Sequence, residues 1–181
     1  MKSIGMIELN SIARGILVTD HIGKAANVKI LRSHSVCPGK YIVIFSGDVG
    51  AVESSKRAGV EIGGVSVINS FVIANIHETV IEAINGTLSD FPREAIGVIE
   101  YFSIASAIQG ADDAAKASDV SLVNVRLGFA IGGKSYITLT GKVSAVEEAV
   151  KAGMRRAQDE GLIVDYCILP SPIDELYNSI L

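Results

Sequence analysis

The sequence predicts two α+β sandwich domains in tandem, each with a four-stranded sheet and its helices on one face. An internal repeat runs through the 181 residues, and both copies carry the same order of strand-like and helix-like segments. A series of strand, helix, strand pair, helix and strand folds into a mixed or antiparallel sheet with the helices on one side. We place the first domain at residues 1–92 and the second at residues 93–181.

The repeat is visible by direct comparison of the two halves. Residues 4–8, Ile-Gly-Met-Ile-Glu, are matched 92 positions later by residues 96–100, Ile-Gly-Val-Ile-Glu. Further along, Gly39 is matched by Gly133, an offset of 94. The second half therefore contains a two-residue insertion between Val120 and Gly133. A repeat of this length indicates a duplicated domain, in which each copy folds in the same way.

In the first half, β-branched and aromatic residues alternate with helical patterns and turn residues. Strands are expected at residues 4–9, 28–36, 41–45 and 65–74, and helices at 11–26, 49–61 and 77–84. In the second half, strands are expected at 96–101, 120–129, 135–139 and 162–169, and helices at 103–117, 143–159 and 173–180. A linker at residues 85–93, which includes Gly86, Asp90 and Pro92, joins the halves.

Composition excludes several classes of function. The net charge is −4 and no basic block occurs, so a nucleic-acid partner is not expected. Charged residues interrupt every apolar run before the roughly 20 residues that a membrane-spanning helix needs, and no signal-peptide pattern precedes the first strand. We expect a cytoplasmic protein without a membrane partner. Cys37 and Cys167 are 130 positions apart, and a structural disulfide is not expected in a reducing compartment.

Three segments together resemble the bacterial microcompartment shell domain: residues 4–8, Lys-Ala-Ala-Asn-Val at residues 24–28, and Gly-Asp-Val-Gly-Ala-Val at residues 47–52. The resemblance implies a ferredoxin-like α/β sandwich and a structural, non-enzymatic protein of the microcompartment shell. Tandem members of this family form trimers that imitate the hexameric tiles of single-domain members. A homotrimer that associates with other shell proteins is therefore expected. Single-domain members carry an Arg between prolines after the fourth strand, and this chain departs from that pattern at residues 75–77 and 170–172.

In this family the loop between the second and third strands lines the central pore of the tile. The corresponding residues here are Cys37, Pro38 and Gly39 in the first half and Ile131, Gly132 and Gly133 in the second half. The first of these turns resembles that of iron–sulfur-binding tandem members, in which one cysteine from each of three subunits holds a cluster. The resemblance therefore implies a 4Fe-4S cluster on Cys37 and electron transfer across the shell, with an encapsulated or cytosolic redox enzyme as a further partner.

The chemistry of this ligand set follows from the cysteine count. A 4Fe-4S cluster is normally held by four thiolates, and one chain with two dissimilar cysteines cannot supply them. A threefold axis through the Cys37 turns would supply three thiolates and leave one iron open to another ligand. Zinc also accepts three thiolates, and an isolated turn cysteine without any metal is the plain alternative.

Other residues receive structural interpretations. Lys24 and Lys116 lie near the C-terminal ends of matched helices, where the resemblance implies the tile edge and the helix dipole alone would also favour a cation. Glu8 and Glu100 occupy the same place in both halves, which indicates a role in the fold or an interface rather than acid–base chemistry. Cys167 is expected to be a small buried hydrophobic residue within its strand.

Two other functions compete with the redox shell protein. One is a shell pore that conducts small metabolites or delivers an intact cluster, without a redox role. The other is a small-molecule-binding regulator built on duplicated ferredoxin-like domains. Colour and iron content after anaerobic purification distinguish the first from a redox protein, and the size of the assembly in solution tests the second.

Overall fold

The first repeat folds as its strand and helix pattern predicts. In the computed structural model, which describes residues 3–86, 88 and 90–179, its strands are antiparallel and lie in the order β2-β3-β1-β4. The elements are β1 (Ser3–Leu9), α1 (Ile12–Ala25), β2 (Val28–Val36), β3 (Lys40–Gly47), α2 (Val49–Gly63), the short 3₁₀ helix η1 (Gly64–Ser66) and β4 (Val67–Ile73).

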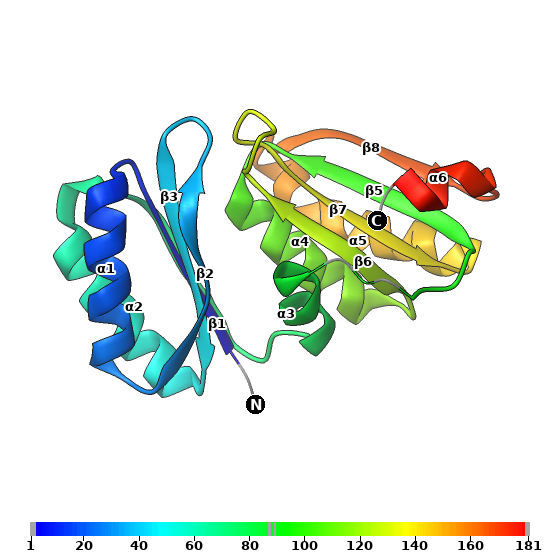
Figure 1. The fold of residues 1–181 in the computed structure, drawn as a ribbon. Coiled ribbons are helices and arrows are strands. Elements are labelled where there is room, and N and C mark those ends of the chain that lie inside the picture. Colours follow the sequence, from blue (N-terminus) through cyan, green and yellow to red (C-terminus); the bar gives the residue numbers. More distant parts are fainter. Residues whose placement is uncertain (1–2, 87, 89, 180–181) are drawn as a thin grey trace. The chain divides into compact units, whose positions relative to one another are not determined.

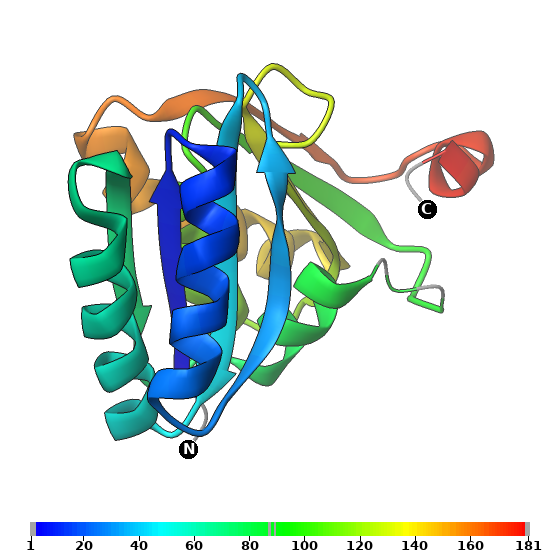
Figure 2. The same ribbon diagram turned by 60° about the vertical axis from the view of Figure 1, so that its left-hand side comes forward.

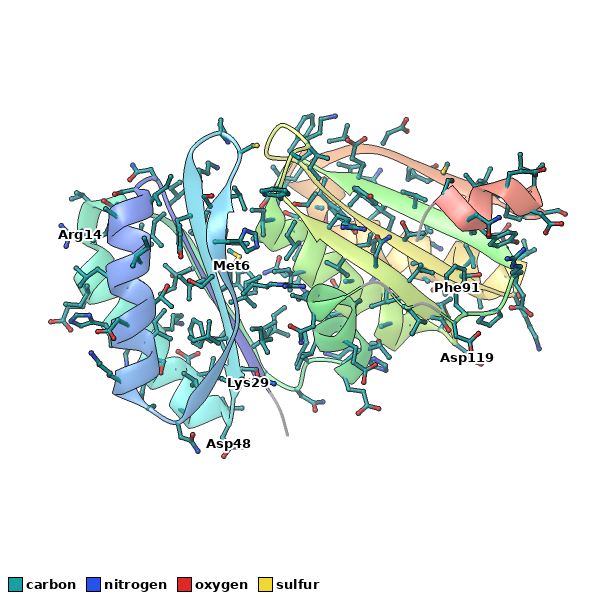
Figure 3. The ribbon with its side chains drawn as sticks, viewed as in Figure 1. Met6, Arg14, Lys29, Asp48, Phe91 and Asp119 are labelled. Carbon is teal, nitrogen blue, oxygen red and sulfur yellow. The ribbon has the colours of Figure 1, made fainter. Side chains whose placement is uncertain are left out.

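Helices α1 and α2 lie side by side on one face of this sheet (Figures 1 and 2). The core between them is formed by alternate residues of β1 and β3 together with the inner faces of the helices. Met6 lies on the other face of the sheet (Figure 3). The buried cluster on the helix side consists of Ile7, Leu9, Val18, Ile22, Tyr41, Val43, Phe45 and Val52.

The second repeat forms a sheet of the same topology, with the antiparallel order β6-β7-β5-β8. Its elements are β5 (Ala95–Tyr101), α4 (Ile104–Ala117), β6 (Ser121–Leu127), β7 (Ser135–Gly141), α5 (Val143–Asp159), β8 (Ile163–Leu169) and α6 (Asp174–Ser179). The predicted α+β class, with two four-stranded sheets and helices, is confirmed.

Two glycines allow α4 and α5 to approach closely. A Cβ atom at Gly110 would lie 2.8 Å from the carbonyl oxygen of Gly153, and one at Gly153 would lie 3.0 Å from that of Gly110. The Tyr101 hydroxyl donates a hydrogen bond to the same Gly153 carbonyl at 3.1 Å. Glycine at these positions thus removes the side chains that would otherwise separate the two helices.

The two compact units of the chain are Met1–Ile76 and His77–Leu181. Helix α3 (Glu78–Asn85), which ends the first repeat, packs against β6 and α4 of the second unit. The contacts therefore divide the chain before α3, whereas the predicted boundary at residue 92 marks the end of the sequence repeat. Residues 87 and 89 of the predicted linker and Ile180 of the predicted last helix lie outside the described residues.

Two strands predicted at residues 65–74 and 120–129 are only seven residues long in the structure. The fourth strand begins at Val67 instead of residue 65, because Gly64–Ser66 form η1 and leave Val65 fully exposed. The strand expected at 120–129 ends at Leu127, where the chain turns away from β7. In both cases the β-branched or aromatic residues that suggested a longer strand lie in exposed connections.

Candidate functional site

The predicted pore residues of the first unit lie at the tip of the β2–β3 hairpin. The Gly39 N–H donates to the Val36 carbonyl at 3.0 Å and closes the turn, and Gly39 has a φ of +81°, which glycine adopts without strain. The peptide bond between Cys37 and Pro38 is cis. Cys37 is half-buried, while Pro38 is exposed. The thiol thus lies at the rim of a tight turn, within reach of a ligand from outside the chain.

The matching turn of the second unit is longer. Ser35 pairs with Tyr41, and their counterparts Leu127 and Ser135 pair in the same register. Four residues, 36–39, therefore separate the matched positions Ser35 and Lys40, whereas six residues, 128–133, separate Leu127 and Lys134. The two-residue insertion predicted from the repeat is thereby located in this hairpin turn.

Ile131, Gly132 and Gly133 lie in that longer turn. The Lys134 N–H donates to the Ile131 carbonyl at 3.3 Å, and Gly132 and Gly133 have φ values of +66° and +81°. Phe129, next to them, is 70% exposed. The two turns thus share their closing glycine conformation but differ in length, and the longer one has no thiol.

An ion pair follows each turn. Lys40 Nζ lies 3.0 Å from Glu8 Oε1, and Lys134 Nζ lies 2.8 Å from Glu100 Oε1. The carboxylates that matched between the two halves are therefore neutralised by matched lysines. The first pair joins β3 to β1, and the second joins Lys134, the residue before β7, to β5. Both lie directly below the turns, which agrees with a role in the fold.

The lysines predicted at the tile edge also form matched pairs. Lys24 Nζ lies 2.6 Å from Asp20 Oδ2, and Lys116 Nζ lies 2.5 Å from Asp112 Oδ2. Both lysines are in the last helical turn, where the helix dipole favours a cation. Lys24 is the more exposed of the two, at 73% of its side chain against 39% for Lys116. Their role at a tile edge stays a prediction.

Asp112 has a second role that the sequence alone did not indicate. Its Oδ1 accepts a hydrogen bond of 2.8 Å from the backbone N–H of His77, the residue before α3. Asp112 thereby holds the end of the first repeat on the second unit. The match between Asp20 and Asp112 in the repeat was the available signal, because a carboxylate at the same place in both halves indicates a shared structural position.

Asp113 was also missed. It lines a hollow of about 550 Å³ between α4 and α5, beside Arg155 and Arg156. Burial raises the pKa of Asp113, Arg156 at 3.5 Å lowers it, and the neighbouring Asp112 raises it further. Burial also raises the pKa of Tyr101, and Asp113 adds to that effect. No feature of the sequence distinguishes Asp113 from an exposed helix carboxylate.

The prediction for Cys167 is wrong. Cys167 lies on β8, the edge strand beside β5, and its side chain is exposed. Over residues 3–86, 88 and 90–179, the structure contains no cluster of three or more His, Cys, Asp and Glu side chains suited to a metal ion. In the same part of the chain, no helix has the length and apolar character needed to cross a membrane.

Two α+β units of identical strand order, each with a hairpin turn at the matched position, define a duplicated α+β domain. The family model of the BMC domain matches residues 3–76 and again residues 95–172. This chain belongs to the BMC domain family and is a structural shell protein of a bacterial microcompartment.

Individual relatives agree over almost the whole chain. The bacterial microcompartment shell protein PduT of Citrobacter freundii is 40% identical over 180 residues, covering 99% of this chain and 98% of PduT. The crystal structure of a microcompartment protein from Desulfitobacterium hafniense DCB has a TM-score of 0.95 and 49% identity, covering 98% of this chain and 99% of that one. The fused permuted hexameric shell protein MSM0275 from the RMM microcompartment has a TM-score of 0.61 and 25% identity, covering 86% and 81%.

Proposed function

We propose that three copies of this chain close into a six-lobed tile of the shell, with the three Cys37 turns around its central axis. The observation that carries the proposal is the tandem repeat, in which each chain supplies two BMC domains of the same topology. Six such domains complete a closed ring, and three chains supply them. MSM0275, which is described as a fused hexameric shell protein, supports this arrangement.

At the axis, three Cys37 thiolates would hold a 4Fe-4S cluster. The donor set fits this group only between chains, because each chain brings one thiol to a hairpin turn and the other, Cys167, lies on β8. When bound, such a cluster accepts and releases single electrons. Held in a pore, it would transfer electrons across the shell. The Lys40–Glu8 pair would keep the base of each turn in place.

Light scattering tests the tile, since the proposal expects three times the mass of the chain in solution. A stable monomer or dimer would contradict it. Shell proteins of this family also associate with one another, so sheet formation by electron microscopy is the second expected property of the trimer.

Iron and sulfide analysis after anaerobic purification tests the cluster. The wild type should be brown and contain about four irons per trimer, and Cys37→Ser should lose both iron and colour, because a hydroxyl is far less acidic than a thiol and a poor ligand for iron. Cys167→Ser is the matched control and should retain the full iron content. Colourless wild-type trimers would favour a pore for metabolites, and zinc in place of iron would indicate a structural metal.

A further inference from the structure

Helix α3 shows how the end of one repeat is held on the next. Val80, Ala83 and Ile84 are buried on its inner face, and the helix packs against β6 and α4. The His77 N–H donates to Asp112 Oδ1 at 2.8 Å, and Asp112 is only 4% exposed. An apolar helix face and one hydrogen bond to a buried carboxylate therefore define this junction.

Helix α1 of the first unit carries residues that match the buried residues of α4, but on α1 these residues are exposed. Ile12 and Ile16 of α1 are 45% and 58% exposed, whereas their counterparts Ile104 and Ile108 of α4 are 2% and 0% exposed. Asp20, the counterpart of Asp112, lies one turn further along α1 and is exposed, in an ion pair with Lys24. Two isoleucines and a carboxylate thus form a stripe on α1, at positions that match the buried stripe of α4.

Helix α6 is the counterpart of α3. The preceding strands β4 and β8 match at an offset of 96, so His77 corresponds to Ile173 and Val80 corresponds to Leu176. Ile173 is 69% exposed. The helix itself is held on the second unit, because the Tyr177 hydroxyl donates to the Glu94 carbonyl at 2.6 Å and Arg93 lies 5.5 Å from the Tyr177 ring centroid.

Contacts around Tyr177 place α6 beyond the end of β8 (Figure 2). Phe91 is 6.5 Å from the Tyr177 ring, and Arg93 is 3.6 Å from Asp174. The α6 segment is therefore already ordered on its own unit while Ile173 stays exposed. The exposed segment that begins at Ile173 matches the α3 side of the junction, and the exposed stripe on α1 matches its α4 side. These two surfaces are therefore complementary in the same way as α3 and α4.

We infer that the α1 stripe of one copy, formed by Ile12, Ile16 and Asp20, is the docking surface for the segment from Ile173 to Tyr177 of a second copy. The backbone N–H of Ile173 donates to the Asp20 carboxylate, as His77 does to Asp112. Leu176 packs on the isoleucines. This inference rests on the proposed trimer and specifies the contact that joins successive chains in the ring.

Thiol crosslinking tests the contact. In a Cys37→Ser and Cys167→Ser background, Asp20→Cys with Ile173→Cys and a short bifunctional thiol reagent should convert most of the protein to covalent dimers and trimers. The matched pair His77→Cys with Asp112→Cys should crosslink within one chain only. A crosslink of the first pair that also stays within one chain, or none in protein that is trimeric by light scattering, would overturn the inference and leave the proposed tile intact.

A second measurement uses single substitutions. Asp20→Ala should weaken trimer association about tenfold or more, the effect of losing a hydrogen bond to a charged group. Lys24→Ala removes the ion-pair partner but leaves the acceptor, so association should change by less than about threefold. Equal trimer affinity for Asp20→Ala and the wild type would contradict the contact. Absence of a trimer in the wild type would instead contradict the proposed function, and the inference with it.

Discussion

Lys40 and Glu8 form an ion pair of 3.0 Å between neighbouring strands, directly below the turn that carries Cys37. The Glu8 side chain is 8% exposed, whereas that of Glu100 in the matching pair is 35% exposed. The same interaction therefore occurs twice in one chain, once nearly buried and once at the surface. A buried carboxylate that loses its counter-charge is much more costly than an exposed one.

Lys40→Ala should consequently destabilise the protein by about 1–3 kcal/mol, the cost of leaving a buried charged group without its partner. Lys134→Ala is the matched variant and should cost less than about 1 kcal/mol, as exposed ion pairs do. Unfolding in urea, compared for the two variants, measures the difference. Equal losses of unfolding free energy in the two variants would show that the buried ion pair and the exposed ion pair contribute equally to stability.

Gly15→Ala should destabilise the first unit. A Cβ atom there would lie 2.3 Å from the Tyr41 ring, and the Tyr41 hydroxyl is hydrogen-bonded at 3.0 Å to Ser33. Overpacking of this kind costs about 1–3 kcal/mol. Gly23→Ala, on the same helix with no atom within 4 Å of the new Cβ, should instead stabilise by up to about 1 kcal/mol through helix propensity. Thermal unfolding of both variants checks the opposite signs, and two changes of the same sign would contradict the packing argument.

Asp113→Asn should raise stability at neutral pH. Because the pKa of Asp113 is raised in the folded protein, chiefly by burial, the folded state binds more protons than the unfolded chain above the usual value of 3.8. The free energy of unfolding therefore falls as pH rises from the pKa of Asp113 in the unfolded chain to its higher pKa in the folded protein. This loss of stability remains at higher pH. The melting temperature of the variant should exceed that of the wild type at about pH 7 and approach it below about pH 4.

Glu148→Gln is the control for that experiment. Glu148 lines the same hollow but is exposed, so its neutralisation should change stability by less than about 0.5 kcal/mol at each pH. A melting temperature of Asp113→Asn that is below the wild-type value at neutral pH would show that the Arg156 ion pair outweighs the cost of burial.

Lys24→Ala and Lys116→Ala should weaken the association of tiles into sheets while the trimer keeps its mass, because the proposed edge lies away from the axis. Lys24, the more exposed lysine, should have the larger effect. Electron microscopy of sheets, beside light scattering of the trimer, is the measurement. Loss of the trimer in either variant would place that lysine at an interface within the ring.

The fold was predictable because duplication made the pattern visible twice. Glycines at matched hairpin positions and the repeated Ile-Gly-x-Ile-Glu strand were sufficient for the sheet and for the location of both turns. The exposure of Cys167 was not predictable, because an apolar run is the same in an edge strand as in a central strand. Its place at the edge follows from the strand order, which depends on pairing across the whole repeat.

The attachment of α3 was also beyond local sequence. A helix was predicted at residues 77–84, but a helix pattern does not specify which surface covers its apolar face. The hydrogen bond from His77 to Asp112 spans 35 residues, and the raised pKa of Asp113 depends on how closely α4 and α5 approach. Both are products of tertiary packing.

Unequal turns have a consequence for symmetry. Fusing two domains into one chain halves the number of identical positions around a ring, so a substitution in one turn appears once for every two hairpin tips. Any ring built from this chain therefore carries half as many Cys37 thiols as tips, because the longer turn has none. In a ring of identical single domains, every substitution in the turn occurs at all of the tips. Such a ring cannot carry a residue at only half of them. In the proposed trimer, duplication would thus place three equivalent thiols in a ring of six domains.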